Sequence, residues 1–170
     1  MVISGSSSGQ QLCIPIVETL LLILAGTAWR LQTLAHGKAT FLEQYTNDLS
    51  PGAFTPSCSA YHLPPYVQKF QELKSKGVDI VAFIANNDEF VLNGWGKINH
   101  VPKGEDFLML SDSKTFFSEN YGWQAGPNKG DRTGRWAMIV EKDGSISYAE
   151  NEAKLQDVEV SSVETVLSKL

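Results

Sequence analysis

The sequence has few of the residues that build metal centres and disulfide frameworks. Its 170 residues include only two cysteines, Cys13 and Cys58, and three scattered histidines, His36, His62 and His100. Two cysteines are too few for a disulfide scaffold, and neither they nor the histidines have the spacing of a zinc site. We therefore expect no metal and no other cofactor.

Positive charge is also scarce. Fourteen Lys and Arg against nineteen Asp and Glu give a net charge of -5 at pH 7 and a sequence pI near 5.2. With no Lys/Arg cluster either, the chain lacks the electrostatic footprint of a nucleic-acid-binding protein, so nucleic acid is excluded as a partner. The content of 42% hydrophobic and 19% charged residues fits one globular domain with a sizeable core.

A long uninterrupted hydrophobic run is missing as well. The most apolar segment, residues 12–29, is interrupted by Pro15 and Glu18, which leaves less than the ~20 residues that a membrane-spanning helix needs. The eleven residues before it carry no positive charge, which a signal peptide would have there. Helical spacing predicts an amphipathic or buried helix instead, with these residues on one face: Leu20, Leu21, Leu24, Ala28, Leu31 and Ala35.

After Cys58, helical and extended patterns alternate along the chain. Helices are predicted over residues 66–77, 88–99, 113–122 and 160–170, with Asn87 or Asp88 as the cap of the second. Strands are predicted over residues 78–85 and 107–112, and as a hairpin through Asp143-Gly144 within residues 135–150. This order implies an α/β protein, with a mixed sheet and helices on both faces.

Cys58 lies in the stretch SPGAFTPSCSAYHLPPYV, just before a predicted helix. If the helix begins near Ser57 or Cys58, the sulfur lies beside unpaired backbone N–H groups and the positive end of the helix dipole, which favours a thiolate. Thr55 could direct its hydroxyl at that thiolate or at an oxygen of a small substrate. The residues alone leave two interpretations, a reactive nucleophile and a small packed core cysteine.

The segments PGAFTPSCS and HLPPY closely resemble the active-site loop of peroxiredoxins, specifically the type-five branch with fungal peroxisomal and cytosolic members. The family pattern is Pro-x-x-x-Thr-x-x-Cys, and Pro51, Thr55 and Cys58 occupy its three places. The later segments NNDEFVLNGWGK and GRWAMIVEKDGSI are similar to further parts of the same branch. The resemblance covers residues 51–170, implies a thioredoxin-like fold there, and sets residues 1–50 apart as an atypical segment.

The resemblance implies a thiol-specific peroxidase of antioxidant defence. Cys58 would attack the O–O bond of hydrogen peroxide or an alkyl hydroperoxide and become a sulfenic acid. Arg135, matched by its position before WAMIVEKDG, would polarise the peroxide and stabilise the thiolate, since its fork of donors suits two oxygens at once. The other interpretation of Arg135 is a surface or dimer-interface arginine.

The resemblance also suggests supporting roles and partners. Arg132 is the candidate for a supporting or interface residue, and His62 either hydrogen-bonds near the site or packs in the core. Cys13, in a CIP context similar to that of the resolving cysteine of fungal relatives, either resolves the sulfenic acid or is a buried inert thiol. The implied reductant is thioredoxin or glutathione, and the implied assembly is a homodimer.

One segment departs from the family. Relatives run an apolar strand into the loop, whereas the polar residues FLEQYTNDLS precede it here. Either a central strand is missing because the first 50 residues are an altered end, or KATFLEQY forms a shorter strand. A missing strand would leave the loop without its anchor. The alternative function is therefore a catalytically weak or inactive, holdase-like interaction protein on an incomplete fold.

The chain ends in Ser168, Lys169 and Leu170. SKL at the C-terminus is read by the peroxisomal import receptor, although a helix could also end in these residues by chance. We expect a peroxisomal location, with the cytoplasm as the alternative. Import needs an accessible tail, so Val163 and Val166 should pack while the last three residues protrude.

Overall fold

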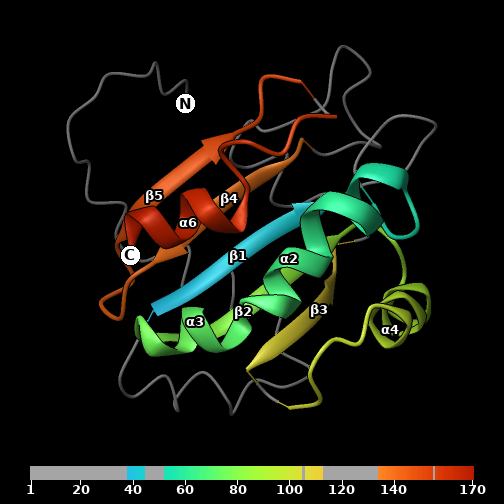
Figure 1. Cartoon of the computed structure of the whole chain (residues 1–170), viewed down its shortest axis with the longest axis horizontal. Coiled ribbons are helices and arrows are strands. Elements are labelled where there is room, and N and C mark those ends of the chain that lie inside the picture. The colour runs from blue at the N-terminus through green and yellow to red at the C-terminus, as the bar shows by residue number, and fades with distance from the viewer. Residues whose placement is uncertain (1–37, 45–51, 105, 113–133, 155) are drawn as a thin grey trace.

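The computed structural model describes residues 38–44, 52–104, 106–112, 134–154 and 156–170 (Figure 1). The helices predicted over residues 12–35 and 113–122 lie outside these ranges. Among the described helices, none is long and apolar enough to cross a membrane.

The strands of the described residues form one mixed sheet. Its strand order is β3-β2-β1-β4-β5 (Figure 1). The pairs β1–β2 and β2–β3 are parallel, and the pairs β1–β4 and β4–β5 are antiparallel. This mixed topology confirms the predicted thioredoxin-like α/β fold. The strands are β1 (Lys38–Gln44), β2 (Val78–Ala85), β3 (Phe107–Ser111), β4 (Trp136–Val140) and β5 (Ile146–Asn151).

The central strand comes from the segment that departs from the family pattern. β1 pairs along its whole length with β2, from Lys38 opposite Val78 to Gln44 opposite Ala85, and its other edge pairs with β4. Of the two alternatives for this region, the short strand is therefore confirmed. The sheet is complete across the centre, and the loop that carries Cys58 follows a strand that is hydrogen-bonded on both edges.

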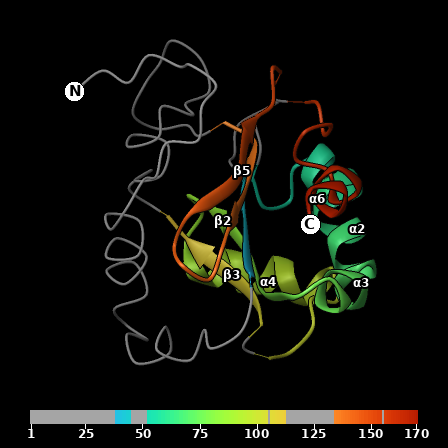
Figure 2. The ribbon, with the colours of Figure 1, turned by 90° about the vertical axis from the view of Figure 1, so that its left-hand side faces the viewer.

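The described helices cover one face of the sheet. Figure 2 shows all of them on the same side, so the described residues carry no helix on the other face, where the sequence also predicted helices. Asp88 caps α4 (Glu89–Ile98), because its Oδ1 accepts the N–H groups of Phe90 and Val91, each at 2.9 Å. The helices are η3 (Cys58–His62), α2 (Leu63–Gln68), α3 (Phe70–Ser75), α4 (Glu89–Ile98) and α6 (Val163–Lys169).

The helical segment after Cys58 begins earlier than the predicted residues 66–77, and its first turn is wide. The N–H of Leu63 donates to the carbonyl of Cys58, five residues back, which makes this turn a π-helix. Pro64 and Pro65 follow and have no N–H to donate, so the regular ladder cannot form across this point. Gly77, at a φ of 89°, ends the segment as predicted.

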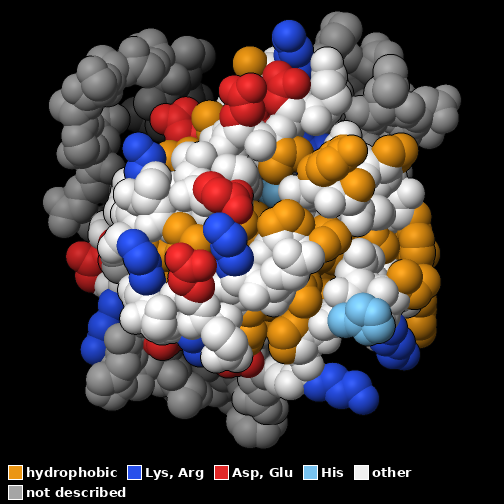
Figure 3. Space-filling view, in the orientation of Figure 1, with side chains coloured by type: hydrophobic (Ala, Val, Ile, Leu, Met, Phe, Trp, Pro, Cys, Tyr) orange, Lys and Arg blue, Asp and Glu red, His pale blue; other side chains and the backbone are white. Residues whose placement is uncertain are grey.

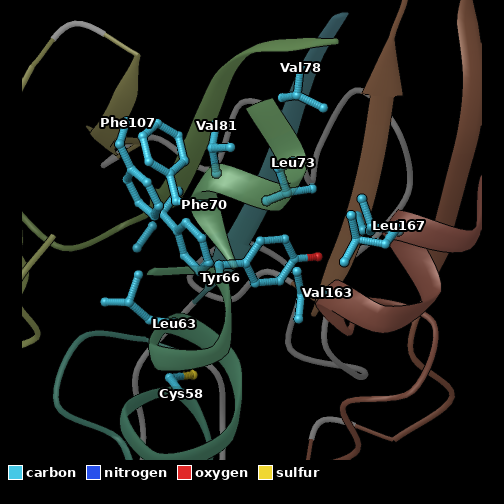
Figure 4. Packing of buried hydrophobic residues seen from close by; sticks show 14 of the residues in the cluster. Cys58, Leu63, Tyr66, Phe70, Leu73, Val78, Val81, Phe107, Val163 and Leu167 are labelled. Carbon is cyan, nitrogen blue, oxygen red and sulfur yellow. The ribbon is translucent and has the colours of Figure 1, made fainter. Parts of the chain in front are cut away.

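The hydrophobic core lies between this helical layer and the sheet. Tyr66, Phe83 and Phe107 form a continuous row of rings, with centroids 5.3 Å apart in the first pair and 5.8 Å in the second. Val163 and Leu167 of α6 close one side of the cluster (Figure 4). Figure 4 also shows the oxygen of Tyr66 directed toward α6, so one ring both fills the core and reaches a polar partner.

The C-terminal tail differs in part from its expectation. Val163 and Val166 are buried and Ser168 and Lys169 are exposed, as expected. The expectation that Leu170 protrudes is wrong, because α6 continues through Lys169 and carries Leu170 back against the hydrophobic cluster.

Candidate active site

The sheet brings Cys58 and Arg135 together from distant parts of the chain. Cys58 lies in the first turn of the helical segment that follows β1, two residues after this segment begins at Pro56, and Arg135 immediately precedes β4. Because β4 is antiparallel to β1 and Trp136 pairs with Glu43, the start of β4 lies beside the end of β1. The antiparallel register therefore places Arg135 beside the C-terminal end of β1, which leads into the loop that carries Cys58.

The sulfur of Cys58 is fully buried, and among the described residues two N–H groups donate to it. The backbone N–H of Gly52 lies 3.1 Å from Sγ, and Nη1 of Arg135 lies 3.3 Å from it. Hydrogen bonds of this kind strengthen when the acceptor carries negative charge. The sulfur is thus a hydrogen-bond acceptor for two donors, in addition to being packed in the core.

Thr55 acts on the loop around the cysteine. Its Oγ1 donates to the carbonyl of Gly52 at 2.8 Å, so the hydroxyl proton is directed at the loop backbone instead of at the sulfur. This contact holds Gly52 where its N–H meets Sγ, and it leaves the hydroxyl oxygen as an acceptor. Between them, Phe54 adopts a φ of 64°, an uncommon value for a bulky residue and a local strain beside the site.

His62 links the arginine to the core. Its Nδ1 lies 3.2 Å from Nη1 of Arg135, and its Nε2 lies 3.0 Å from the carbonyl of Ser161. A carbonyl only accepts and a guanidinium only donates, so Nε2 carries the proton and Nδ1 accepts. Burial, and then the charge of Arg135, hold the pKa of His62 well below its ordinary value, although the bond to Ser161 opposes this. His62 is therefore a neutral, hydrogen-bonded core residue at the site.

Acidification should destabilise the protein through His62. The pKa of this ring is lower in the folded protein than in the unfolded chain, so the unfolded chain takes up the proton first as the pH falls. Stability is then full above about pH 6.5 and falls below it, by at most about 1.4 kcal/mol per pH unit. Urea denaturation of the wild type and of His62→Asn across this range measures the effect, and the variant should show the shallower slope.

The matched control for this measurement is His100→Asn. His100 is exposed and has a φ of 57°, a conformation that asparagine tolerates well. This variant should keep the wild-type dependence on pH. Equal slopes in the wild type and His62→Asn would contradict the assignment of a neutral buried ring.

The remaining predicted site residues, Pro51, Arg132 and Cys13, lie outside the described residues. Sequence reasoning missed the N–H of Gly52 and the carbonyl of Ser161. Both are backbone groups, and no residue type marks a backbone group as functional. Within the described ranges, no group of three His, Cys, Asp or Glu side chains could hold a metal ion.

Comparison with known proteins identifies the family of this chain. Residues 20–167 match the family model described as Redoxin. The chain is 45% identical over 120 residues to the putative peroxiredoxin prxA of Emericella nidulans, covering 71% of this chain and 68% of that protein. It is 43% identical over 122 residues to a putative peroxisomal peroxiredoxin of Lipomyces kononenkoae, covering 71% of each. The crystal structure of reduced Prx3 in complex with H2O2 from Vibrio vulnificus has a TM-score of 0.67 at 35% identity, over 82% of this chain and 86% of that one.

A thioredoxin-like sheet with a buried cysteine at a helix start, and an arginine from a neighbouring strand against its sulfur, defines a thiol-dependent peroxidase. The chain belongs to the peroxiredoxin family, which confirms the resemblance seen in its sequence. It is an oxidoreductase whose substrates are peroxides. Nothing in the fold or in the relatives favours the inactive, holdase-like alternative.

Proposed function

We propose that Cys58 is the peroxidatic nucleophile and that Arg135 holds the peroxide and stabilises the charge that moves during attack. The observation that carries this proposal is the convergence of Arg135 Nη1 and the Gly52 N–H on one buried sulfur. The Cys58 thiolate attacks one peroxide oxygen, an S–O bond forms, and the O–O bond breaks. The departing oxygen leaves as hydroxide or alkoxide and takes up a proton to give water or an alcohol.

Arg135 suits this step because its planar fork of N–H donors can contact two oxygens at once. Nη1 already lies against the sulfur, so an oxygen that is forming a bond to that sulfur comes within reach of the same guanidinium. Thr55 holds the Gly52 turn and offers its hydroxyl oxygen to a peroxide O–H. We assign Pro51 to stiffening the same loop, and Arg132 to a supporting or interface role.

The substrates in this proposal are hydrogen peroxide and alkyl hydroperoxides. A buried sulfur in a tight turn favours a small oxidant, and the related Vibrio vulnificus structure was solved with hydrogen peroxide. The test mixes reduced protein with one equivalent of either peroxide and follows peroxide loss together with the mass of the Cys58 peptide. In Cys13→Ser, which lacks the other cysteine of the chain and so cannot form a disulfide with it, the expected result is one oxygen added to Cys58 for each peroxide consumed.

Cys13 is proposed as the thiol that resolves the sulfenic acid. Its thiol would attack the Cys58 sulfur, form a disulfide between two chains, and release water. After peroxide treatment, a reducible band at twice the monomer mass should appear, and it should be missing in Cys13→Ser. Accumulation of Cys58 as sulfinic acid or as a glutathione adduct in the wild type would point instead to a one-cysteine mechanism. The glutathione adduct would also identify glutathione as the reductant. Thioredoxin is the other candidate for the reductant that returns the oxidised cysteine to a thiol.

A homodimer is proposed because bulky apolar side chains are exposed beside the site. Phe54 is 55% exposed, Tyr61 is 70% exposed, and Phe90 is 79% exposed. Figure 3 shows hydrophobic side chains gathered on the side of the molecule where α2 and α4 lie. A second copy would cover this surface, and sedimentation of the reduced protein measures the mass of the assembly.

A peroxisomal location is proposed from the C-terminal SKL, and one relative is named as peroxisomal. A fluorescent protein fused at the N-terminus should give puncta that overlap a peroxisomal marker, and deletion of Leu170 should make the signal diffuse. Since Leu170 packs against the core, its side chain has to leave this contact when the receptor binds. Diffuse signal from both fusions would support the cytoplasmic alternative.

A further inference from the structure

A closed path of hydrogen bonds runs from the backbone of Arg135 back to its own guanidinium. The carbonyl of Arg135 accepts the N–H of Glu152 at 2.7 Å. Oε1 of Glu152 accepts the N–H of Ser161 at 2.8 Å and its Oγ–H at 2.7 Å. The carbonyl of Ser161 accepts from Nε2 of His62, whose Nδ1 accepts from Arg135 Nη1 at 3.2 Å.

The β4–β5 hairpin explains why Glu152 is at this point. Trp136 pairs with Asn151, so the residues just outside this pair, Arg135 and Glu152, also lie side by side. The carboxylate of Glu152 then holds the turn before α6, where it also accepts the N–H of Glu159 at 2.7 Å. One residue thus fixes both the backbone of the arginine and the turn whose carbonyl orients the histidine.

Burial makes the geometry of this path restrictive. Arg135 and Ser161 are fully buried, His62 is 1% exposed and Glu152 is 5% exposed. Polar groups in such surroundings keep their partners, because losing one leaves an uncompensated buried group. The Ser161 carbonyl also accepts the hydroxyl of Tyr66 at 2.9 Å, so its position is fixed from two sides.

We propose that Glu152 is a positioning residue for Arg135, acting through Ser161 and His62. The carboxylate holds the Ser161 carbonyl, and the carbonyl keeps the proton of His62 on Nε2. The lone pair on Nδ1 is thereby available to Nη1 of Arg135, which keeps the guanidinium directed at the sulfur. This inference rests on the proposed roles of Cys58 and Arg135. Glu152 does not touch the reacting atoms.

The test compares two reactions of the same sulfur in Glu152→Ala. Peroxide reduction needs an arginine placed to hold oxygens, whereas alkylation of the thiolate by iodoacetamide does not. In the plateau where neither rate changes with pH, the variant should lose roughly tenfold or more in the peroxide rate. Its alkylation rate should change by less than about threefold. A purely structural role would lower both rates together.

A double-mutant cycle locates the effect. If Glu152 acts through Arg135, then adding Glu152→Ala to Arg135→Ala should cause no further loss of peroxide rate. The matched control is Glu150→Ala, an exposed carboxylate two residues away on β5, which should keep the wild-type rate. Glu152→Gln keeps an acceptor oxygen of the same reach and should lose less, so it serves as the folded variant if Glu152→Ala unfolds.

The outcomes separate this inference from the proposed function. A wild-type peroxide rate in a folded Glu152 variant would overturn the positioning role, as would an equal loss in both Arg135 backgrounds. If Arg135→Ala itself keeps the wild-type peroxide rate, the proposed role of the arginine fails, and the role of Glu152 fails with it.

Discussion

Replacing Cys58 with serine is expected to abolish peroxide reduction, with a loss of about 10⁴-fold or more. The serine hydroxyl is a far weaker nucleophile near neutral pH, because it does not ionise there, and it cannot form a sulfenic acid. The substitution also exchanges one small atom for another within the same turn, so the fold should be retained. The measurement is the second-order rate of hydrogen peroxide consumption under reducing conditions.

The matched control is Cys13→Ser, which keeps the proposed nucleophile. This variant should consume its first equivalent of peroxide at the wild-type rate, whatever happens to later turnovers. Mass spectrometry should find the added oxygen on Cys58 in this control and no added oxygen at position 58 in the serine variant. Peroxide consumption at the wild-type rate by Cys58→Ser would refute the mechanism.

Loss of the Arg135 guanidinium is expected to have the second largest effect. Removing a preorganised donor from a developing oxyanion costs roughly 10²- to 10³-fold. Arg135→Ala removes the donor to the sulfur and, in the proposed mechanism, the donors to the peroxide. Arg135→Lys should recover little of this loss, since a lysine presents a single ammonium group and cannot contact two oxygens in the same geometry. The two variants are compared by the same peroxide assay.

Because Arg135 is buried, its variants need a separate measure of folding. Circular dichroism and thermal unfolding show whether each variant keeps its structure, and Lys97→Ala, an exposed cation on α4, controls for a change in net charge. The surface or interface role that the sequence left open for Arg135 is wrong, because the side chain is fully buried. A folded Arg135→Ala with wild-type activity would therefore leave this residue with a structural role alone.

The elements that were predicted well are those whose signals are local. The strand over residues 78–85 agrees with β2 at both ends, because a short, continuous run of β-branched and apolar residues is typical of a buried strand. Asp88 was one of two predicted caps of α4, since an N-cap aspartate acts on N–H groups only two and three residues away. The Asp143-Gly144 hairpin is local in the same sense, with Gly144 at a φ of 83°.

The central strand shows where local signals end. KATFLEQ has no strong strand pattern, and the residues alone left its structure open between a strand and none. Its place is decided by its two neighbours, because β2 and β4 each present a hydrogen-bonding edge that this backbone satisfies. The strand forms because its pairing partners, which lie far along the chain, are available to it. A short stretch of sequence around residues 38–44 does not include these partners.

By itself, the sequence determined the family of this protein, which the comparisons confirm. It also marked the candidate site residues, a cysteine in the pattern Pro-x-x-x-Thr-x-x-Cys and an arginine before a predicted strand. Only the tertiary structure decided what surrounds the sulfur. A turn brings the N–H of Gly52 to the sulfur. The carbonyl of Ser161 and the carboxylate of Glu152 lie one and two contacts further away, and they connect to Arg135 through His62 and the hairpin register. Backbone groups look alike in every sequence, so their partners are known only once the fold has brought them together.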